Sequence, residues 1–171
     1  MLETIKKRLF ARRDPVEEPT VPDPAKRFPH SQNSELFAFL RKSWLERCNL
    51  PSVRSGGDYP FLTHPDLIER FRTLAPSPDV MQDSVYGRAI MATPTGIVFA
   101  WAGGMNDIFL RLPRSLQQAA VDELGRYDPT YGEDWIDFPA FGSRYGARVN
   151  PDETLHRWMR IAYVESLKVS S

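Results

Sequence analysis

Apolar residues recur at helical spacing in four stretches of the chain. The clearest stretch is 34–48, where Phe37 and Leu40 begin a stripe along one face of a helix. Asn33 or Ser34 is a suitable N-cap for this helix. Similar stripes that follow polar or proline-containing starts predict three further helices, at 63–74, 115–124 and 151–167.

A second pattern, of alternating apolar and polar positions, predicts β-strands between and after these helices. The expected strands are 84–92, 97–102, 107–112 and 135–141. Pro139 cannot donate a hydrogen bond to a neighbouring strand, so we expect the fourth strand at an edge of the sheet. The order of elements predicts an α+β domain with an antiparallel sheet of about four strands (β-β-β-α-β-α), preceded by two helices.

The first 30 residues differ in composition from the rest of the chain. Residues 1–13 contain five basic residues and one acidic residue, and residues 14–24 contain four acidic residues and four prolines. Closely spaced prolines exclude a regular helix, so we expect a flexible tail at 1–30 and a single domain at 31–171. A short basic amphipathic helix on such a tether is typical of a docking peptide. Its candidate docking residues are Leu2, Ile5, Lys6, Lys7, Arg8 and Leu9.

Composition narrows the class of protein. Apolar residues make up 42% and charged residues 26%, and the 22 basic residues balance the 22 acidic ones, which argues against a global electrostatic grip on nucleic acid or acidic lipid. The single cysteine, Cys48, cannot form an intrachain disulfide and is expected to pack as an apolar residue. The sequence contains neither an apolar run near the roughly 18 residues of a membrane span nor a secretory signal. We therefore expect a cytoplasmic protein with no transmembrane segment.

The sequence contains no motif that identifies an active site, a metal site or a cofactor site. His30, His64 and His156 lie far apart and are expected at helix starts or on the surface. We therefore assign no catalytic residue, no metal ligand and no cofactor. An enzyme with a site assembled from scattered residues stays an alternative. The members of that site would be Asp58, His64, Tyr86 and Arg88.

One face of the predicted sheet combines aromatic residues with arginine. Its members are Tyr86, Arg88, Trp101, Phe109, Arg111 and Trp135. Arginine beside aromatic rings is common where proteins bind partners or stack on bases, so this face is a candidate partner-binding surface. The alternative is that the helix at 34–48 covers this face, with the arginines reaching the carboxylates of that helix.

The second half of the chain resembles a known family. Residues 84–168 contain, in order, VYGRAIM, GIVFAWAGGMNDIFLRLP, SLQQAAVDELG, WIDFPAF and NPDETLHRWMRIAYVESL. This succession resembles the N-terminal domain of the TfoX competence regulators and, more loosely, is similar to the YjbR/MmcQ proteins. The resemblance implies a small non-enzymatic domain, often regulatory, and it transfers no catalytic residues.

Together these observations favour a non-enzymatic interaction or regulatory protein. We expect it to bind a protein partner through the aromatic/arginine sheet face or through the basic N-terminal segment. A nucleic-acid-binding accessory regulator is an alternative, which the neutral net charge does not favour. The enzyme described above is the other alternative.

Overall fold

The computed structural model of the chain describes residues 23–48, 63–141 and 151–169. Its helices are α2 (Ser34–Cys48), α4 (Pro65–Thr73), α5 (Arg114–Glu123) and α6 (Pro151–Val169). Its strands are β1 (Met81–Val85), β2 (Arg88–Ala92), β3 (Val98–Gly103), β4 (Asp107–Arg111), β5 (Arg126–Tyr127) and β6 (Trp135–Pro139). Three short 3-10 turns are η1 (Pro24–Lys26), η2 (Ser31–Asn33) and η3 (Pro129–Tyr131). Two groups of residues named above lie outside the described ranges. They are Asp58 and the expected docking residues of the tail, Leu2, Ile5, Lys6, Lys7, Arg8 and Leu9.

The six strands form one antiparallel sheet in the order β1-β2-β3-β4-β6-β5. The α+β class and the antiparallel sheet are therefore confirmed, whereas the expected count of about four strands is wrong. The stretch 84–92 was expected to be a single strand, but Tyr86 and Gly87 divide it into the hairpin of β1 and β2. Both residues have positive φ, 48° and 73°, as a tight hairpin turn requires. The two-residue strand β5 is too short to leave a periodic signal.

Strand β6 was expected at an edge of the sheet, and this expectation is wrong. It lies between β4 and β5. The short β5 pairs only with Ile136 and Asp137, so it ends before Pro139, where β6 has no backbone N–H to offer. Proline is thus accommodated in an inner strand because the neighbouring strand does not extend to it.

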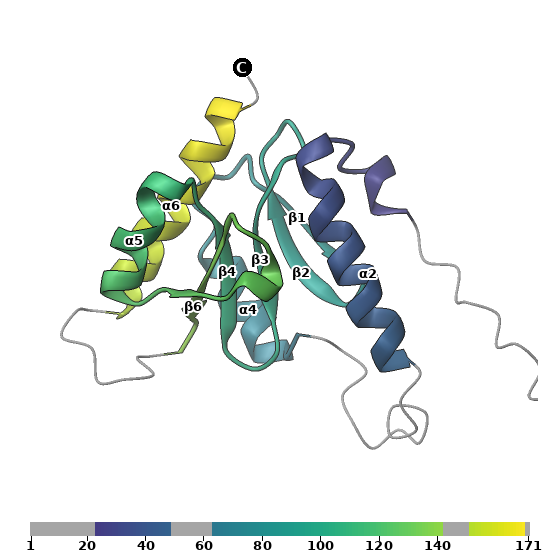
Figure 1. The fold of residues 1–171 in the computed structure, drawn as a ribbon, viewed down its shortest axis with the longest axis horizontal. Helices are drawn as coiled ribbons and strands as arrows, with labels where there is room; N and C mark the ends of the chain where they lie inside the picture. The colour runs from purple at the N-terminus through teal and green to yellow at the C-terminus, as the bar shows by residue number, and fades with distance from the viewer. Residues whose placement is uncertain (1–22, 49–62, 142–150, 170–171) are drawn as a thin grey trace, which may run out of the picture.

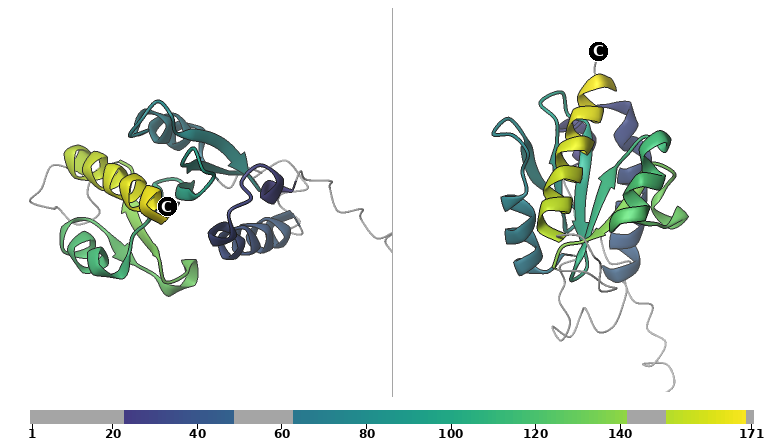
Figure 2. Two further views of the ribbon diagram at one scale, coloured as in Figure 1. Left: turned by 90° about the horizontal axis from the view of Figure 1, so that it is seen from above. Right: turned by 90° about the vertical axis from the view of Figure 1, so that its left-hand side faces the viewer.

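Helices cover both faces of the sheet (Figure 1). Helices α4 and α6 lie on one side and α2 on the other, as the view from above shows (Figure 2). A large apolar core lies between the face of the sheet that α4 and α6 cover and the helices α4, α5 and α6. It includes Phe71, Phe138 and Trp158. A second core, rich in aromatic rings, lies between the other face and α2, and includes Leu40 and Trp101. The aromatic/arginine face of the sequence is thus the α2 face.

The buried side chain of Asn33 joins the segment before α2 to the sheet region and does not cap the helix. Asn33 was a candidate N-cap of α2, but its side chain bonds elsewhere. Its Nδ2 donates to the carbonyl oxygens of Phe28 (3.2 Å) and Gly96 (2.7 Å), and its Oδ1 accepts from the backbone N–H of Val98 (2.9 Å). Phe28 is 1% exposed, so ordered packing begins before residue 31, within the stretch that was expected to be tail.

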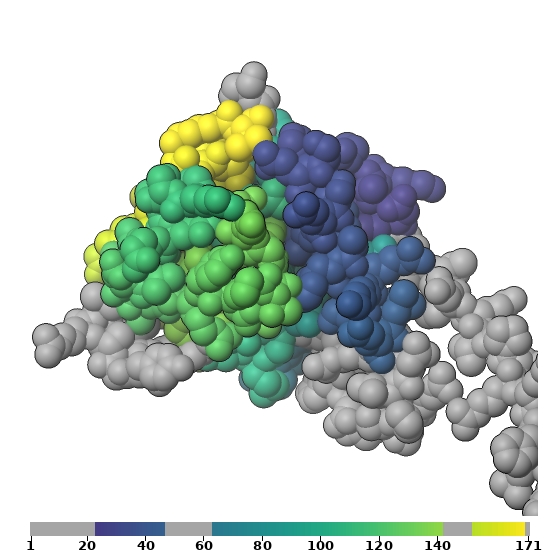
Figure 3. Space-filling view, in the orientation of Figure 1, coloured from purple at the N-terminus to yellow at the C-terminus, as the bar shows by residue number. Residues whose placement is uncertain are grey.

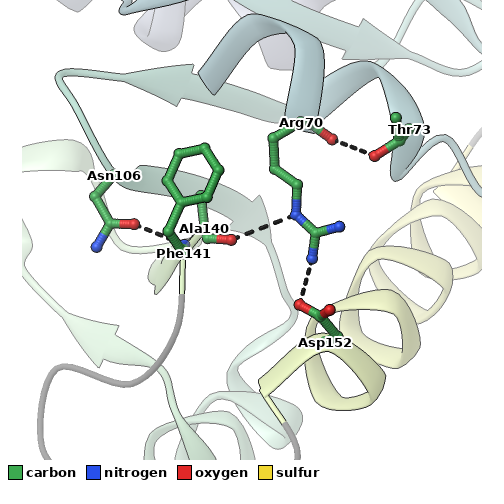
Figure 4. A network of polar contacts seen from close by, with 6 residues as sticks. All are labelled: Arg70, Thr73, Asn106, Ala140, Phe141 and Asp152. Carbon is green, nitrogen blue, oxygen red and sulfur yellow. Dashed lines mark hydrogen bonds and ion pairs between the residues drawn. The ribbon is translucent and has the colours of Figure 1, made fainter. Parts of the chain in front are cut away.

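A polar network joins three elements at one end of the sheet (Figure 4). Arg70 of α4 donates from Nε to the carbonyl oxygen of Ala140 (3.4 Å) and from Nη2 to Asp152 of α6 (2.5 Å). The side-chain oxygen of Asn106 accepts from the backbone N–H of Phe141 (2.7 Å). These contacts hold α4, the end of β6 and the start of α6 together.

A candidate groove between helix α2 and residues 128–134

Three of the six residues expected to form a binding surface are buried. The rings of Trp101 and Phe109 stack with centroids 3.8 Å apart and an interplanar angle of 6°. Trp101, Phe109 and Trp135 are 1%, 2% and 5% exposed. Helix α2 covers them with Leu36, Leu40 and other apolar side chains. The helix at 34–48 therefore covers these three rings, as the alternative had it, and they do not form an open surface. The Nη groups of Arg111, which were expected to reach a carboxylate of that helix, donate to Gln32 instead.

A second segment covers the part of this face that α2 leaves open. We call residues 128–134 the cover segment. The ring of Tyr131 in this segment lies 4.5 Å from Phe109 and meets Phe39 of α2 edge-to-face at 5.5 Å (centroid distances). The carboxylate of Asp128 accepts a hydrogen bond from the backbone N–H of Thr130 (2.9 Å), which starts η3. Hydrogen bonding from the side chain of Thr130, and then from its backbone N–H, holds the pKa of Asp128 below its ordinary value.

An ion pair between an exposed arginine and a buried aspartate anchors the start of this region to the sheet. Arg126 of β5 donates from Nε (3.1 Å) and Nη2 (2.6 Å) to one carboxylate oxygen of Asp137 on β6. Asp137 is 1% exposed, and burial raises the pKa of its carboxyl group in spite of the guanidinium. Burial alone would lower the pKa of Arg126, but the Asp137 carboxylate outweighs it and raises that pKa.

A groove of about 510 Å³ separates α2 from the cover segment. We call it the seam groove. Figure 3 shows the surface of α2 meeting that of the cover segment and its flanks along this line. The lining consists of Gln32, Glu35, Leu36 and Phe39 on one side, residues 129–135 on the other, and Arg111 from β4.

Arg111 connects the two walls of the seam groove. Its Nη1 and Nη2 donate to the side-chain and main-chain oxygens of Gln32, both at 3.0 Å. Its Cζ lies 4.9 Å from the centroid of the Trp135 ring, a cation–π contact. Burial lowers the pKa of the guanidinium to about 10, against the opposing effect of Asp134 and Glu35. Arg111 is therefore a cation already engaged with protein groups.

A smaller hollow of about 310 Å³ adjoins the seam groove. We call it the side hollow. It shares Gln32, Arg111 and Asp134 with the seam groove. Its remaining lining comes from the start of α5 and the end of α6, namely Leu112, Pro113, Glu165, Ser166, Lys168 and Val169. The two cavities are thus neighbours, and the same three side chains line both of them.

The remaining expected site residues lie elsewhere on the same face. The ring of Tyr86 is 6.0 Å from that of Trp44, and Tyr86 lines a separate hollow of about 290 Å³. The Cζ of Arg88 lies 5.4 Å from the Trp101 ring, and its guanidinium lies over Gly103. The structure therefore brings only Arg111 and Trp135 of the expected set to the seam groove.

Sequence reasoning missed the other main groups of the seam groove, which are Gln32, Glu35, Phe39, Tyr131 and Asp134. The turn signal Asp128-Pro129 was present, but a turn signal does not reveal which ring the following residue covers. Glu35 and Phe39 lie one helical turn apart on α2, and only docking of that helix gives them a shared cavity.

The scattered enzyme site of the sequence analysis is not brought together in the described residues. His64 accepts from the backbone N–H of Asp66 (3.2 Å) and caps α4, which packs on the α6 face of the sheet. Tyr86 and Arg88 belong to the α2 face, and Asp58 lies outside the described residues. Among the residues that the structure describes, no three His, Cys, Asp or Glu side chains are grouped as metal ligands. No helix in the described ranges is both long and apolar enough to cross a membrane.

Comparisons of this chain with protein-family profiles, curated proteins and solved structures find no match.

Proposed function

We propose that this protein is a non-enzymatic interaction protein that binds a segment of a protein partner in the seam groove. The observation that carries the proposal is the cavity of about 510 Å³ between α2 and the cover segment, which aromatic rings and Arg111 border. A regulatory role in the cytoplasm, as expected from the sequence, is part of the same proposal.

The kinds of side chain in the groove support a protein partner. Tyrosine, tryptophan and arginine are enriched at protein interfaces, where their large flat groups bury area at low entropic cost. Phe39, Tyr131 and Arg111, all half-buried, gather here from separate stretches of the chain, whereas Trp135 borders the groove as a buried ring. Their rings are already held by neighbouring rings and hydrogen bonds, so little ordering is left for binding to impose.

A site-specific photo-cross-linker tests this proposal. p-Benzoylphenylalanine at Thr130, an exposed residue of the seam groove, is compared with the same group at Val121, an exposed residue of α5. Both variants of the full chain are irradiated in a native lysate, and the cross-linked peptides are identified by mass spectrometry.

We expect a discrete cross-linked protein from Thr130 that is absent from Val121. Recovery of the same products from both positions, or of none from Thr130, would count against partner binding in the seam groove. Binding of nucleic acid to the same position would favour the alternative of a nucleic-acid-binding accessory regulator.

A further inference from the structure

The charges around the seam groove favour a cationic ligand group. Among the described residues, the carboxylates of Glu35 and Asp134 have no hydrogen-bond or ion-pair partner, and both residues are exposed. The opposing cation, Arg111, already directs both Nη groups at Gln32. Glu133, the third carboxylate, is paired with Arg114 outside the groove. Arg111 keeps its charge in the bonds to its neutral partner Gln32 and attracts both carboxylates, so Glu35, Asp134 and Arg111 together leave one net negative charge in the groove.

The aromatic rings of the groove add a second attraction for a cation. Phe39 and Tyr131 line it from opposite walls and meet edge-to-face, with an interplanar angle of 83°. A lysine or arginine side chain packed against an aromatic ring is stabilised by its electron-rich face, and more so where carboxylates stand nearby. Rings and carboxylates here come from both walls, so the same entering group is within reach of each.

The side hollow favours an aliphatic group instead. Pro113 and Val169 supply accessible apolar lining, in front of the buried Leu112. Its charged lining consists of two cations, Arg111 and Lys168, and two carboxylates, Asp134 and Glu165, and so has no net charge; Lys168 and Glu165 are paired at 2.5 Å. A small branched side chain can therefore cover apolar surface in this hollow without leaving a charge unpaired.

The adjacency of the two cavities sets the spacing between the two ligand groups. In an extended peptide, side chains on one face recur every second residue, about 6.6 Å apart. The seam groove and the side hollow share three lining residues, Gln32, Arg111 and Asp134, and so adjoin each other. A helix would place its neighbouring side chains three or four residues apart in sequence instead.

From these observations we infer that the partner segment is a peptide that presents a lysine or arginine and an aliphatic residue side by side on one face, two residues apart where the peptide is extended. The cation enters the seam groove against the Phe39–Tyr131 ring pair, on the side of Glu35 and Asp134. The aliphatic side chain fills the side hollow. This inference rests on the proposed function, and it adds the chemistry of the partner.

A synthetic probe tests the inference. The probe is a fluorescein-labelled peptide, Gly-Ser-Ile-Lys-Lys-Arg-Leu-Ser-Gly, which contains the pattern in both directions. The same pattern occurs in this chain at Ile5–Leu9, so the protein used is the full chain carrying Lys6→Ser, Lys7→Ser and Arg8→Ser, which removes that competitor. Binding is measured by fluorescence anisotropy at low salt.

Two altered peptides separate the two ligand groups. We expect glutamate at the three cationic positions to weaken binding at least thirtyfold, and serine at the two aliphatic positions to weaken it about tenfold. Equal affinity for the original and the glutamate peptide would overturn the inference. Equal affinity for the original and the serine peptide would overturn the assignment of the side hollow.

Matched protein variants locate the binding. Glu35→Gln with Asp134→Asn is expected to weaken probe binding about tenfold, whereas Glu69→Gln with Asp79→Asn, which neutralises two exposed carboxylates outside both cavities, leaves it unchanged. The same loss in both double variants would show general charge attraction and would reject the site. If cross-linking from Thr130 still yields a specific partner while the probe fails, only this inference is lost. If both fail, the proposed function is lost as well.

Discussion

Arg111 and Gln32 are joined by two hydrogen bonds of 3.0 Å although they lie 79 residues apart in the chain. One bond goes to the side-chain oxygen of Gln32 and the other to its main-chain oxygen. The planar guanidinium thus determines where the start of α2 meets β4. The same contact forms the boundary between the seam groove and the side hollow.

Replacing Arg111 by lysine is expected to lower the free energy of unfolding by about 1–2 kcal/mol. Lysine keeps the charge but cannot make both bonds to Gln32, each of which contributes about 0.5–1.5 kcal/mol. Urea denaturation followed by tryptophan fluorescence measures the change. The matched control is Arg114→Lys, at an exposed ion pair with Glu133, which should change stability by less than about 0.5 kcal/mol. Equal effects of the two substitutions would refute a special role for the Arg111 contact.

Asn33→Ala should be one of the most destabilising single polar substitutions, at about 3 kcal/mol. It removes three hydrogen bonds and leaves the N–H of Val98 and the carbonyl oxygens of Phe28 and Gly96 without that partner. Thermal and urea unfolding check the value, with Gln118→Ala on the exposed side of α5 as the control. A loss below about 1 kcal/mol would mean that water replaces the asparagine.

The raised pKa of Asp137 predicts that the free energy of unfolding depends on pH. Its folded-state pKa is raised above the ordinary 3.8, so the folded protein binds more protons than the unfolded chain between these two values. The contribution of Asp137 to stability is therefore greatest below pH 3.8 and decreases as the pH rises through the raised pKa. Each unit of elevation corresponds to about 1.4 kcal/mol.

The measurement is the difference in unfolding free energy between the wild type and Asp137→Asn across this pH range. Subtracting the variant cancels the other carboxylates, so the wild type should lose stability relative to the variant as the pH rises. The control is Ser84→Ala, at an exposed position without a titrating side chain, for which the difference should stay flat. A difference that rises with pH would show that the ion pair with Arg126 outweighs burial.

Gly103→Ala is expected to destabilise the aromatic core by about 1–3 kcal/mol. A Cβ at this position would lie 2.2 Å from Nη1 of Arg88 and 2.9 Å from Cζ3 of Trp101. The arginine can move aside, but the Trp101 ring is stacked on Phe109 and has no room. Near-ultraviolet circular dichroism reports the ring packing, and Ser84→Ala at an exposed strand position is the control. An unchanged spectrum would show that the arginine alone absorbs the clash.

Several elements were predictable because their signals are local. The helix expected at 34–48 has those bounds in the structure, since its apolar stripe and flanking residues are read directly from neighbouring positions. The meander of β2, β3 and β4 followed from alternation and glycine turns. The hairpin at Tyr86 was missed because tyrosine is an uncommon residue at positive φ, so the turn leaves only the signal of Gly87.

The candidate site was less predictable than the fold. Alternation correctly placed Trp101, Phe109 and Trp135 on one face of the sheet, opposite the Phe138 face. It could not tell whether that face is open, because coverage by α2 and by the cover segment depends on contacts between residues far apart in the chain. Arg111, predicted as an exposed contact, instead bonds to Gln32 beneath that cover.

By itself, the sequence determined the α+β class, most helices and strands, and which residues share a face of the sheet. These properties follow from periodicities of 2 and 3.6 residues and from turn chemistry, which act over short stretches of chain. Only the tertiary structure decided the order of β6 and β5, the burial of the aromatic residues and the groove between α2 and residues 128–134. Each of these depends on long-range packing, where a single docking event brings together groups such as Glu35, Arg111 and Asp134 that no local pattern connects.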